Sequence, residues 1–337
     1  MTHPRLTFFL ELPAAEVTAL LARPGVLAQL TACRAAIAMA LLDLDPQRAQ
    51  AIRLLTAHQI PVTAWLVLET GEGYWLTADN AHCAKRRYAE VHAWARAEQL
   101  TFAGVGLDIE VPHSAAAPLF DQPLRALGRL LRHSRPEHRV RQARAEYEEL
   151  IQQIREDGYR TETYHLPFIH DEREAGSSLL QRALGIVDVR ADREVLMLYR
   201  SVLAPPFGEL LVDAYGGRAA AIAVGITGGG VAVLQPAFEA RLLDLPALLA
   251  DLRRARRYTE HLYVFSLEGC VESGLLEPLS RADLTAPHDP PRLQRLGQVA
   301  RAGLRSLLTV ETWLQRATLR RRLHRGAEPS GQPPCHL

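Results

Sequence analysis

Short runs of hydrophobic residues alternate along the chain with longer segments in which hydrophobic residues recur every three or four positions. Eight of the short runs are almost continuously apolar, which is typical of parallel strands that are buried on both faces. The predicted strands span Leu6–Leu12, Ala35–Leu42, Pro61–Leu68, Phe102–Val111, Arg160–Pro167, Glu194–Val202, Ala219–Thr227 and His261–Leu267.

The segments between these runs have the spacing of amphipathic helices. The predicted helices span Ala14–Cys33 (interrupted at Pro24), Pro46–His58, Asp79–Gln99, Leu124–His133, Arg139–Asp157, Ser177–Leu184, Pro206–Tyr215, Pro236–Arg257 and Pro291–Arg322. Eight strand–helix units favour an α/β fold in which the sheet closes as a single (β/α)8 TIM barrel. An open Rossmann-like sheet is the alternative, but no GxGxxG follows the first strand. We therefore predict one barrel domain over residues 1–322 and a disordered C-terminal tail over 323–337.

Composition narrows the class of protein. The 337 residues carry 39 lysines and arginines against 38 acidic residues, so a net charge of +1 gives no general attraction to nucleic acid or anionic membranes. The four cysteines lack the spacing of a zinc site or a disulfide framework. No segment has the length and apolarity of a membrane span, and the N-terminus resembles a strand more than a signal peptide. We expect a cytoplasmic protein without a metal, a cofactor, a nucleic-acid partner or a membrane partner.

In a β/α barrel, chemistry is carried out at the C-terminal ends of the strands. Polar and aromatic residues end most of the predicted strands or follow them directly. We expect several of these residues to face the mouth of the barrel and to bind substrate, namely Glu11, Glu69, Trp75, His165, Arg200 and Glu268.

The strongest local pattern lies on the fourth predicted strand, which reads Ala103-Gly-Val-Gly-Leu-Asp-Ile-Glu110. Residues two apart on a strand face the same way, so Asp108 and Glu110 share one face. Two neighbouring buried carboxyls repel each other, and one of them should hold a proton near neutral pH. This arrangement suits a general acid, with Glu110 at the rim and Asp108 beneath it. The alternative is a structural ion pair with an arginine such as Arg200.

At this octet the chain resembles the family 18 glycoside hydrolases, the chitinases and endo-β-N-acetylglucosaminidases, whose strand-four signature is DGxDxDxE. Gly104, Asp108 and Glu110 match the signature, whereas Ala103 and Gly106 replace its first two aspartates. The family's sixth strand carries Met-x-Tyr-Asp, and this chain has Met197-Leu-Tyr-Arg200. The tryptophan that usually ends the eighth strand is missing from the stretch Tyr263–Glu268.

The resemblance implies a carbohydrate or glycoconjugate substrate and a role for three residues. Glu110 would protonate the glycosidic oxygen, Asp108 would orient the substrate's N-acetyl group as the nucleophile, and Tyr199 would hydrogen-bond the cyclic intermediate. If catalysis is not assisted by the substrate, Glu268 or Glu69 would supply a second carboxylate.

Two other functions are compatible with the same strand ends. A metal-dependent sugar isomerase or epimerase would use acidic residues and a histidine as ligands, with Glu69, Glu110, His165 and Glu268 as candidates. A barrel that binds carbohydrate without catalysis is the second alternative, since the motif has lost two aspartates.

Overall fold

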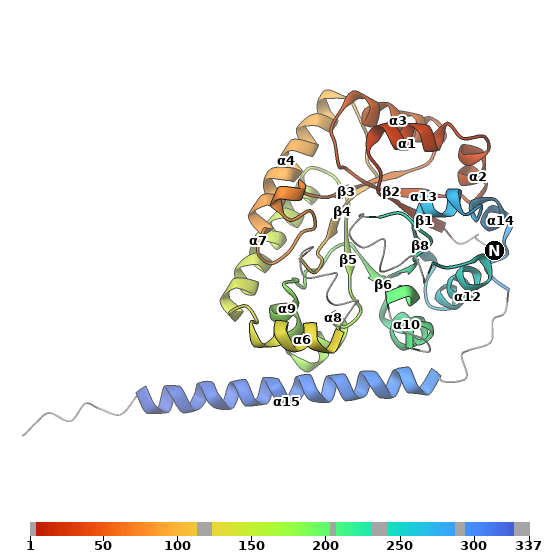
Figure 1. Cartoon of the computed structure of the whole chain (residues 1–337). Coiled ribbons are helices and arrows are strands. Elements are labelled where there is room, and N and C mark those ends of the chain that lie inside the picture. The colour runs from red at the N-terminus through yellow and green to blue at the C-terminus, as the bar shows by residue number, and fades with distance from the viewer. Residues whose placement is uncertain (1–4, 113–122, 203–206, 231–241, 287–293, 327–337) are drawn as a thin grey trace, which may run out of the picture.

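Eight parallel strands form a closed barrel in the order β1 to β8, with β8 pairing back onto β1 (Figure 1). The structure is a computed structural model that describes residues 5–112, 123–202, 207–230, 242–286 and 294–326. The closed parallel topology confirms the predicted single (β/α)8 barrel. The strands are β1 (Arg5–Leu10), β2 (Ala36–Ala40), β3 (Val62–Leu66), β4 (Gly104–Asp108), β5 (Thr161–His165), β6 (Arg193–Met197), β7 (Ala221–Gly225) and β8 (His261–Phe265).

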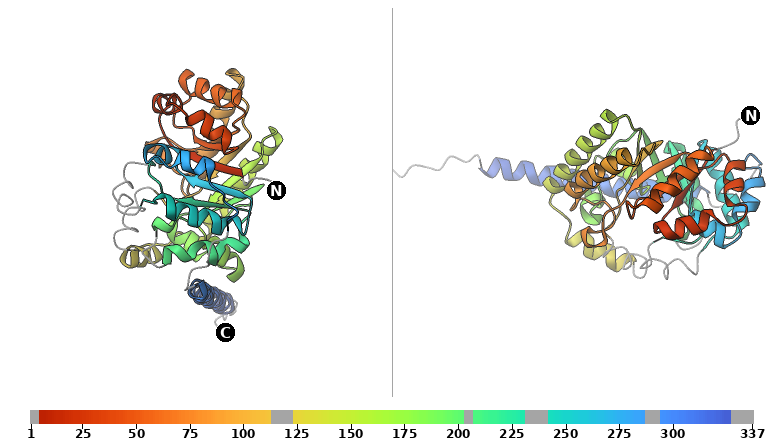
Figure 2. Two further views of the ribbon diagram at one scale, coloured as in Figure 1. Left: turned by 90° about the vertical axis from the view of Figure 1, so that its right-hand side faces the viewer. Right: turned by 90° about the horizontal axis from the view of Figure 1, so that it is seen from above.

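Helices surround the barrel on its outer side (Figures 1 and 2). The α-helices are α1 (Ala14–Leu21), α2 (Val26–Ala32), α3 (Pro46–Ala57), α4 (Ala81–Ala97), α6 (Pro123–Arg132), α7 (Glu137–Glu156), α8 (Ile169–Ala175), α9 (Leu179–Leu184), α10 (Phe207–Tyr215), α12 (Leu245–Arg256), α13 (Leu267–Glu272), α14 (Leu276–Arg281) and α15 (Gln294–Gly326). Short 3-10 helices lie at η1 (Thr70–Glu72), η2 (Arg200–Val202) and η3 (Gly216–Arg218).

Alternating side chains of each strand build two separate hydrophobic layers. The outward residues, such as Phe8 and Leu10 on β1, pack against the helices in the main core. The inward residues fill the barrel with an aromatic cluster that includes Phe9, Trp65 and Tyr164. Phe9 contacts Tyr164 edge to face, with 4.9 Å between ring centroids. Because both faces of each strand are buried, the strands read as continuous apolar runs in the sequence.

The strands are shorter than the apolar runs predicted, because the last residues of several runs turn into loops or helices. Tyr199 and Arg200, for example, follow β6 and do not belong to it. Helix α8 begins directly after the β5 loop, in a segment that has no helical spacing of hydrophobic residues. Helix α15 continues to Gly326, so residues 323–326, which were assigned to the tail, are helical. The remaining tail residues, 327–337, lie outside the described residues.

A cavity of about 550 Å³ lies at the N-terminal end of the strands, opposite the end at which chemistry is expected. Glu162 in its wall forms an ion pair with Arg193 at 3.0 Å and accepts a hydrogen bond of 2.9 Å from Tyr263. These paired groups lie at the N-terminal end of the barrel, and their role is best explained as a contribution to folding stability. Within the described residues, no helix has the length and hydropathy required to cross a bilayer.

Candidate active site

Four carboxyl groups converge at the C-terminal mouth of the barrel. Glu11 follows β1, Asp108 ends β4, Glu110 lies two residues beyond it, and Glu268 lies in the first turn of α13 after β8. Glu268 and Glu110 both raise the pKa of Glu11 by charge repulsion, and Glu110 and Glu11 do the same to Asp108. Asp108 and Glu110 are two positions apart in the sequence, whereas every other pair among the four is 97 to 257 positions apart. Closure of the barrel is what brings all four together.

Asp108 and Glu110 extend the inward face of β4. The Asp108 side chain is buried, and one of its carboxyl oxygens has no hydrogen-bond partner among the described residues. Burial, together with the charges of Glu110 and Glu11, raises the pKa of Asp108 well above its usual value, and the nearby Trp65 indole opposes this only in part. Burial also raises the pKa of the partly exposed Glu110 to about 7. Glu110 is therefore protonated in about half of the molecules at neutral pH, and the pKa of Asp108 is shifted in the same direction.

Tyr74 and Glu11 form the shortest described contact at the mouth. The Tyr74 hydroxyl donates a hydrogen bond of 2.6 Å to Glu11. Burial raises the pKa of Glu11 to about 8 even though this hydrogen bond favours the ionised form. Glu11 is accordingly a protonated carboxyl at neutral pH, held in one orientation by a phenol.

Glu268 faces a glycine loop that follows β7. Its side chain is buried, and burial raises its pKa to about 7, while the Ser266 hydroxyl and backbone amides of Glu11 and Gly230 lower it. A Cβ atom added to Gly229 would lie 2.5 Å from the Glu268 Cγ atom, and Gly229 has a φ of 78°. Because glycine has no side chain, the backbone of this loop approaches the carboxyls of Glu268 and Glu11 more closely than any other residue type would allow.

Tyr199 lies next to these carboxyls. The charges of Asp108, Glu110 and Glu11, added to the effect of burial, raise its pKa well above the usual value. Its ring packs on Phe265 at the end of β8, with 6.0 Å between the centroids. Tyr199 therefore stands as a neutral hydroxyl group beside the acidic cluster. Phe265 occupies the end of the strand on which the resemblance would place a tryptophan.

Gly106 marks the place of a missing carboxyl. A Cβ atom at Gly106 would lie 2.7 Å from Tyr164 Cζ, so the phenol ring fills the space beside the backbone. The family signature has an aspartate at this position, and such a side chain could not fit here unless Tyr164 moved. Asp108 consequently has Glu110 and Glu11 as its acidic neighbours, and no carboxyl lies below it on the same strand.

His165 does not join the cluster. It shares the outward face of β5 with Thr161 and Thr163, since Glu162 and Tyr164 point into the barrel. The ring is buried and its Nε2 lies 3.2 Å from the Val189 carbonyl oxygen. Burial and the Arg173 charge lower its pKa, so the ring stays neutral.

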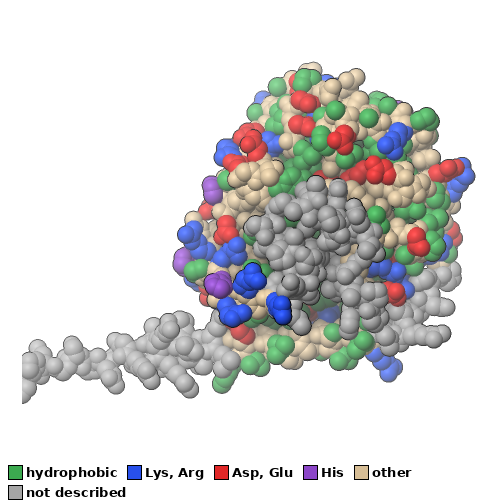
Figure 3. Space-filling view, in the orientation of Figure 1, with side chains coloured by type: hydrophobic (Ala, Val, Ile, Leu, Met, Phe, Trp, Pro, Cys, Tyr) green, Lys and Arg blue, Asp and Glu red, His purple; other side chains and the backbone are tan. Residues whose placement is uncertain are grey.

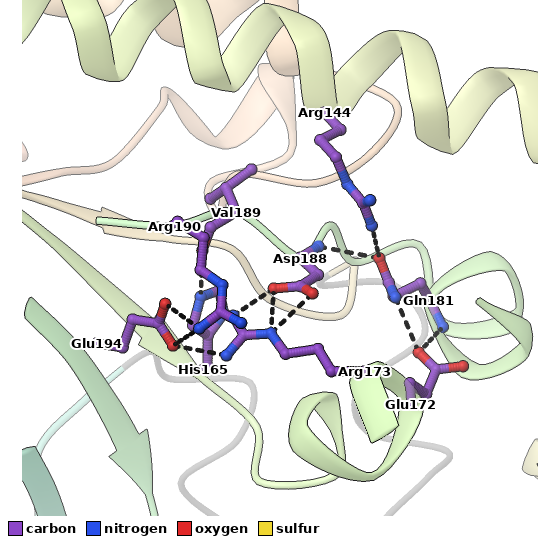
Figure 4. Close-up of polar contacts among 9 residues, drawn as sticks. All are labelled: Arg144, His165, Glu172, Arg173, Gln181, Asp188, Val189, Arg190 and Glu194. Atoms are coloured by element: carbon purple, nitrogen blue, oxygen red, sulfur yellow. Dashed lines mark hydrogen bonds and ion pairs between the residues drawn. The ribbon is translucent and has the colours of Figure 1, made fainter. Parts of the chain in front are cut away.

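The polar network around His165 has a structural explanation (Figure 4). Arg173 forms ion pairs with Asp188 and with Glu194, the latter at 2.7 Å. Gln181 accepts hydrogen bonds from the Asp188 amide and from Arg144. This network joins β6, α7, α8 and α9 on the outer side of the barrel, away from the mouth.

Three further predicted residues lie apart from the carboxyls. The Arg200 Nη2 atom donates a hydrogen bond of 2.9 Å to Asp251 on α12, so Arg200 does not form the alternative ion pair with Asp108 and Glu110. Glu69 is exposed at the start of η1. Trp75 is buried, and its ring packs edge to face against Tyr74. In this loop it is Tyr74, and not Trp75, that reaches the acidic cluster.

The site has a strongly negative net charge once its four carboxyls ionise. Among the described residues, no lysine, arginine or histidine forms an ion pair with any of the four carboxyls or lowers their pKa. The ligand set considered for a metal-dependent isomerase is not assembled, because Glu69 is exposed and His165 faces the helices. Within the described ranges, no group of three or more potential ligands has metal-binding geometry.

Comparison with known proteins supports the fold. No protein-family profile and no curated protein sequence matches the chain. The PgaB (BpsB) glycoside hydrolase domain from Bordetella bronchiseptica is similar in structure, with a TM-score of 0.50 and 10% identity over 86% of this chain and 100% of that one. A GH18 chitinase from Pseudoalteromonas aurantia gives a TM-score of 0.46 and 9% identity over 82% and 98%. An L-ribulose 3-epimerase gives a TM-score of 0.41 and 11% identity over 96% of this chain and 99% of that one. At 10% identity the likeness to the PgaB domain is one of fold.

Proposed function

We propose that the protein is a carbohydrate-active enzyme that hydrolyses glycosidic bonds, with Glu110 as the general acid and Asp108 as the residue that tunes it. The observation that carries this proposal is the pair itself, two residues apart on the inward face at the C-terminal end of β4. A carboxyl with a pKa of about 7 is protonated in roughly half of the molecules at neutral pH, as a general acid requires. An ordinary exposed glutamate would have lost its proton.

The proposed reaction follows from the neighbours of Glu110. Glu110 donates its proton to the leaving glycosidic oxygen as the bond to the anomeric carbon breaks. The resulting carboxylate then accepts a proton from the water that attacks this carbon, which returns Glu110 to its acid form. Buried protein surroundings keep the proton on Glu110 until the leaving oxygen takes it.

Two sources of a nucleophile are compatible with the cluster. In the route that the resemblance implies, the substrate's own N-acetyl oxygen attacks, with Asp108 orienting the amide and Tyr199 donating a hydrogen bond to it. In the second route, Glu268 acts as the carboxylate nucleophile opposite Glu110. Only the first route needs an N-acetyl group on the sugar, so the substrate itself distinguishes the two.

The test is hydrolysis of a panel of aryl glycosides with and without a 2-acetamido group. We expect the wild-type protein to cleave at least one of them and Glu110→Gln to reduce turnover by about 10²–10⁴-fold. Tyr199→Phe should cost less, because it removes one hydrogen bond and leaves the proton donor in place. The matched control is Glu69→Gln, which changes an exposed carboxyl at a neighbouring strand end and should leave turnover unchanged.

Three results would count against the proposal. Equal losses in the Glu110 and Glu69 variants would show that the acidic cluster has no special role. Sugar binding by the wild-type protein without any hydrolysis would favour a barrel that only binds carbohydrate. Loss of activity on chelation, with recovery on adding a divalent cation, would favour isomerase-like chemistry.

A further inference from the structure

Helix α15 exposes an apolar stripe. Leu296, Val299, Leu307, Val310 and Trp313 are exposed to 38, 66, 71, 56 and 67%. In the described part of the chain, the other exposed large hydrophobic residues are Leu54 and Leu242, at 38 and 42%. The spacing of the five residues places them on one side of a helix. Green side chains are visible along the lower edge of the molecule, where α15 lies (Figure 3).

The opposite side of α15 is fixed to the barrel. The Arg301 guanidinium forms an ion pair of 2.7 Å with Asp171 and lies 4.2 Å from the centroid of the Tyr215 ring. Leu308 is buried, and Glu311 lies within 4.0 Å of Arg182. These contacts set the rotation of the helix about its axis. The apolar stripe is therefore held away from the barrel and cannot turn inward.

Positive charge is concentrated in the same helix. Residues 294–326 contain eight arginines and one glutamate, a net charge of +7, whereas the whole chain has a net charge of +1. Five of these arginines fall between Arg316 and Arg325. The near-neutral average that led us to expect no membrane partner therefore hides one strongly basic element.

The position of α15 leaves its outer side accessible. It lies along one edge of the barrel and projects beyond it in Figure 1, and in the left view of Figure 2 it is the outermost element on that edge. A helix of 33 residues is about 50 Å long. A flat surface can therefore lie against much of this helix without meeting the barrel.

We propose that α15 binds the surface of an anionic lipid bilayer, with the apolar stripe at the boundary of the acyl chains and the arginines among the headgroups. Tryptophan, leucine and arginine on one helix are the composition of interfacial helices, and each arginine near an anionic surface adds attraction. Pairing with a second copy would bring together two helices that both remain strongly basic after Arg301 and Arg305 have paired with the barrel. Nucleic acid would match the charge but leave Trp313 and its apolar neighbours in water.

The experiment measures co-sedimentation of the full chain with vesicles of phosphatidylcholine alone or mixed with phosphatidylglycerol. We expect binding to the mixed vesicles and a blue shift of tryptophan emission that Trp313→Phe abolishes, since Trp65 and Trp75 are buried and Trp94 is partly buried against the main core. Arg320→Gln, Arg321→Gln and Arg322→Gln together should weaken partitioning roughly 100-fold. The apolar variant Leu307→Gln/Val310→Gln should also weaken it while keeping the net charge.

A matched control removes the same charge elsewhere on the surface. Arg141, Arg190 and Arg281 are exposed to 69, 70 and 78% of their side chains, and their triple change to glutamine should leave binding intact. Equal loss in both triple variants, or no binding to mixed vesicles, would overturn the proposal. So would a dimer in light scattering that Leu307→Gln/Val310→Gln dissociates. Tighter binding to a nucleic-acid duplex or to polyglutamate than to the vesicles would also contradict it.

Discussion

The substitution Glu110→Gln should stabilise the protein in a manner that depends on pH. Glutamine has nearly the same shape as protonated glutamate but never ionises, so it removes the cost of burying a charge at this position. The pKa of Glu110 is raised from 4.5 to about 7. The folded state therefore holds this proton between these two values while the unfolded state releases it, and stability falls as pH rises through this window.

The size of the effect follows from the same two values. A difference of this size between the folded and unfolded pKa corresponds to roughly 3 kcal/mol of lost stability above pH 7. The partial exposure of Glu110 makes this an upper figure. The variant should match the wild type in unfolding free energy near pH 4 and exceed it by about 1–3 kcal/mol at pH 8.

Urea unfolding at a series of pH values measures this difference. Glu69→Gln serves as the control, because Glu69 is exposed and should change stability by less than about 0.5 kcal/mol at any pH. A Glu110→Gln protein that is less stable than the wild type at pH 8, by about 3–5 kcal/mol, would refute the reasoning. That result would show that Glu110 compensates a buried cation.

Three other predictions concern the walls of the site. Gly106→Ala should destabilise the protein by about 1–3 kcal/mol in thermal melting, because its Cβ would crowd the Tyr164 ring, whereas Gly71→Ala, which meets no atom within 4 Å, should be neutral. Tyr74→Phe should cost about 1.5–3 kcal/mol at pH 9, where Glu11 is ionised, and less at pH 6. Wild-type turnover should fall above pH 7 as Glu110 loses its proton, which a pH–rate profile will show.

The sequence was sufficient to predict the barrel because each strand is buried on both faces. Continuous apolar runs such as those around Phe8 and Ile37 leave little doubt about which segments form the sheet. The ends of elements were harder to predict. Helix α8 contains two buried acidic residues, so its sequence lacks an apolar stripe. Asp171 pairs with Arg301, 130 residues away, and Glu172 accepts hydrogen bonds from the backbone eight and nine residues further on.

The direction of a candidate side chain can be predicted where the inward phase of its strand is known. Asp108 and Glu110 follow one strand at a spacing of two, so their common face was clear. His165 also ends a strand, but the inward phase of β5 belongs to Glu162 and Tyr164. The role of Tyr74 depends on the path of a loop. The sequence shows a glycine run after β7, but only the fold shows that it borders Glu268.

The most direct test of Glu110 as general acid compares substrates that differ only in their leaving group. Fluoride and dinitrophenolate leave from a glycosyl fluoride and a dinitrophenyl glycoside without being protonated. The alcohol of an alkyl glycoside needs a proton in order to leave. We predict that Glu110→Gln loses about 10²–10⁴-fold in kcat/KM on the alkyl glycoside and keeps most of its activity on the activated substrate. Equal losses on both substrates would contradict the assignment of Glu110 as the proton donor.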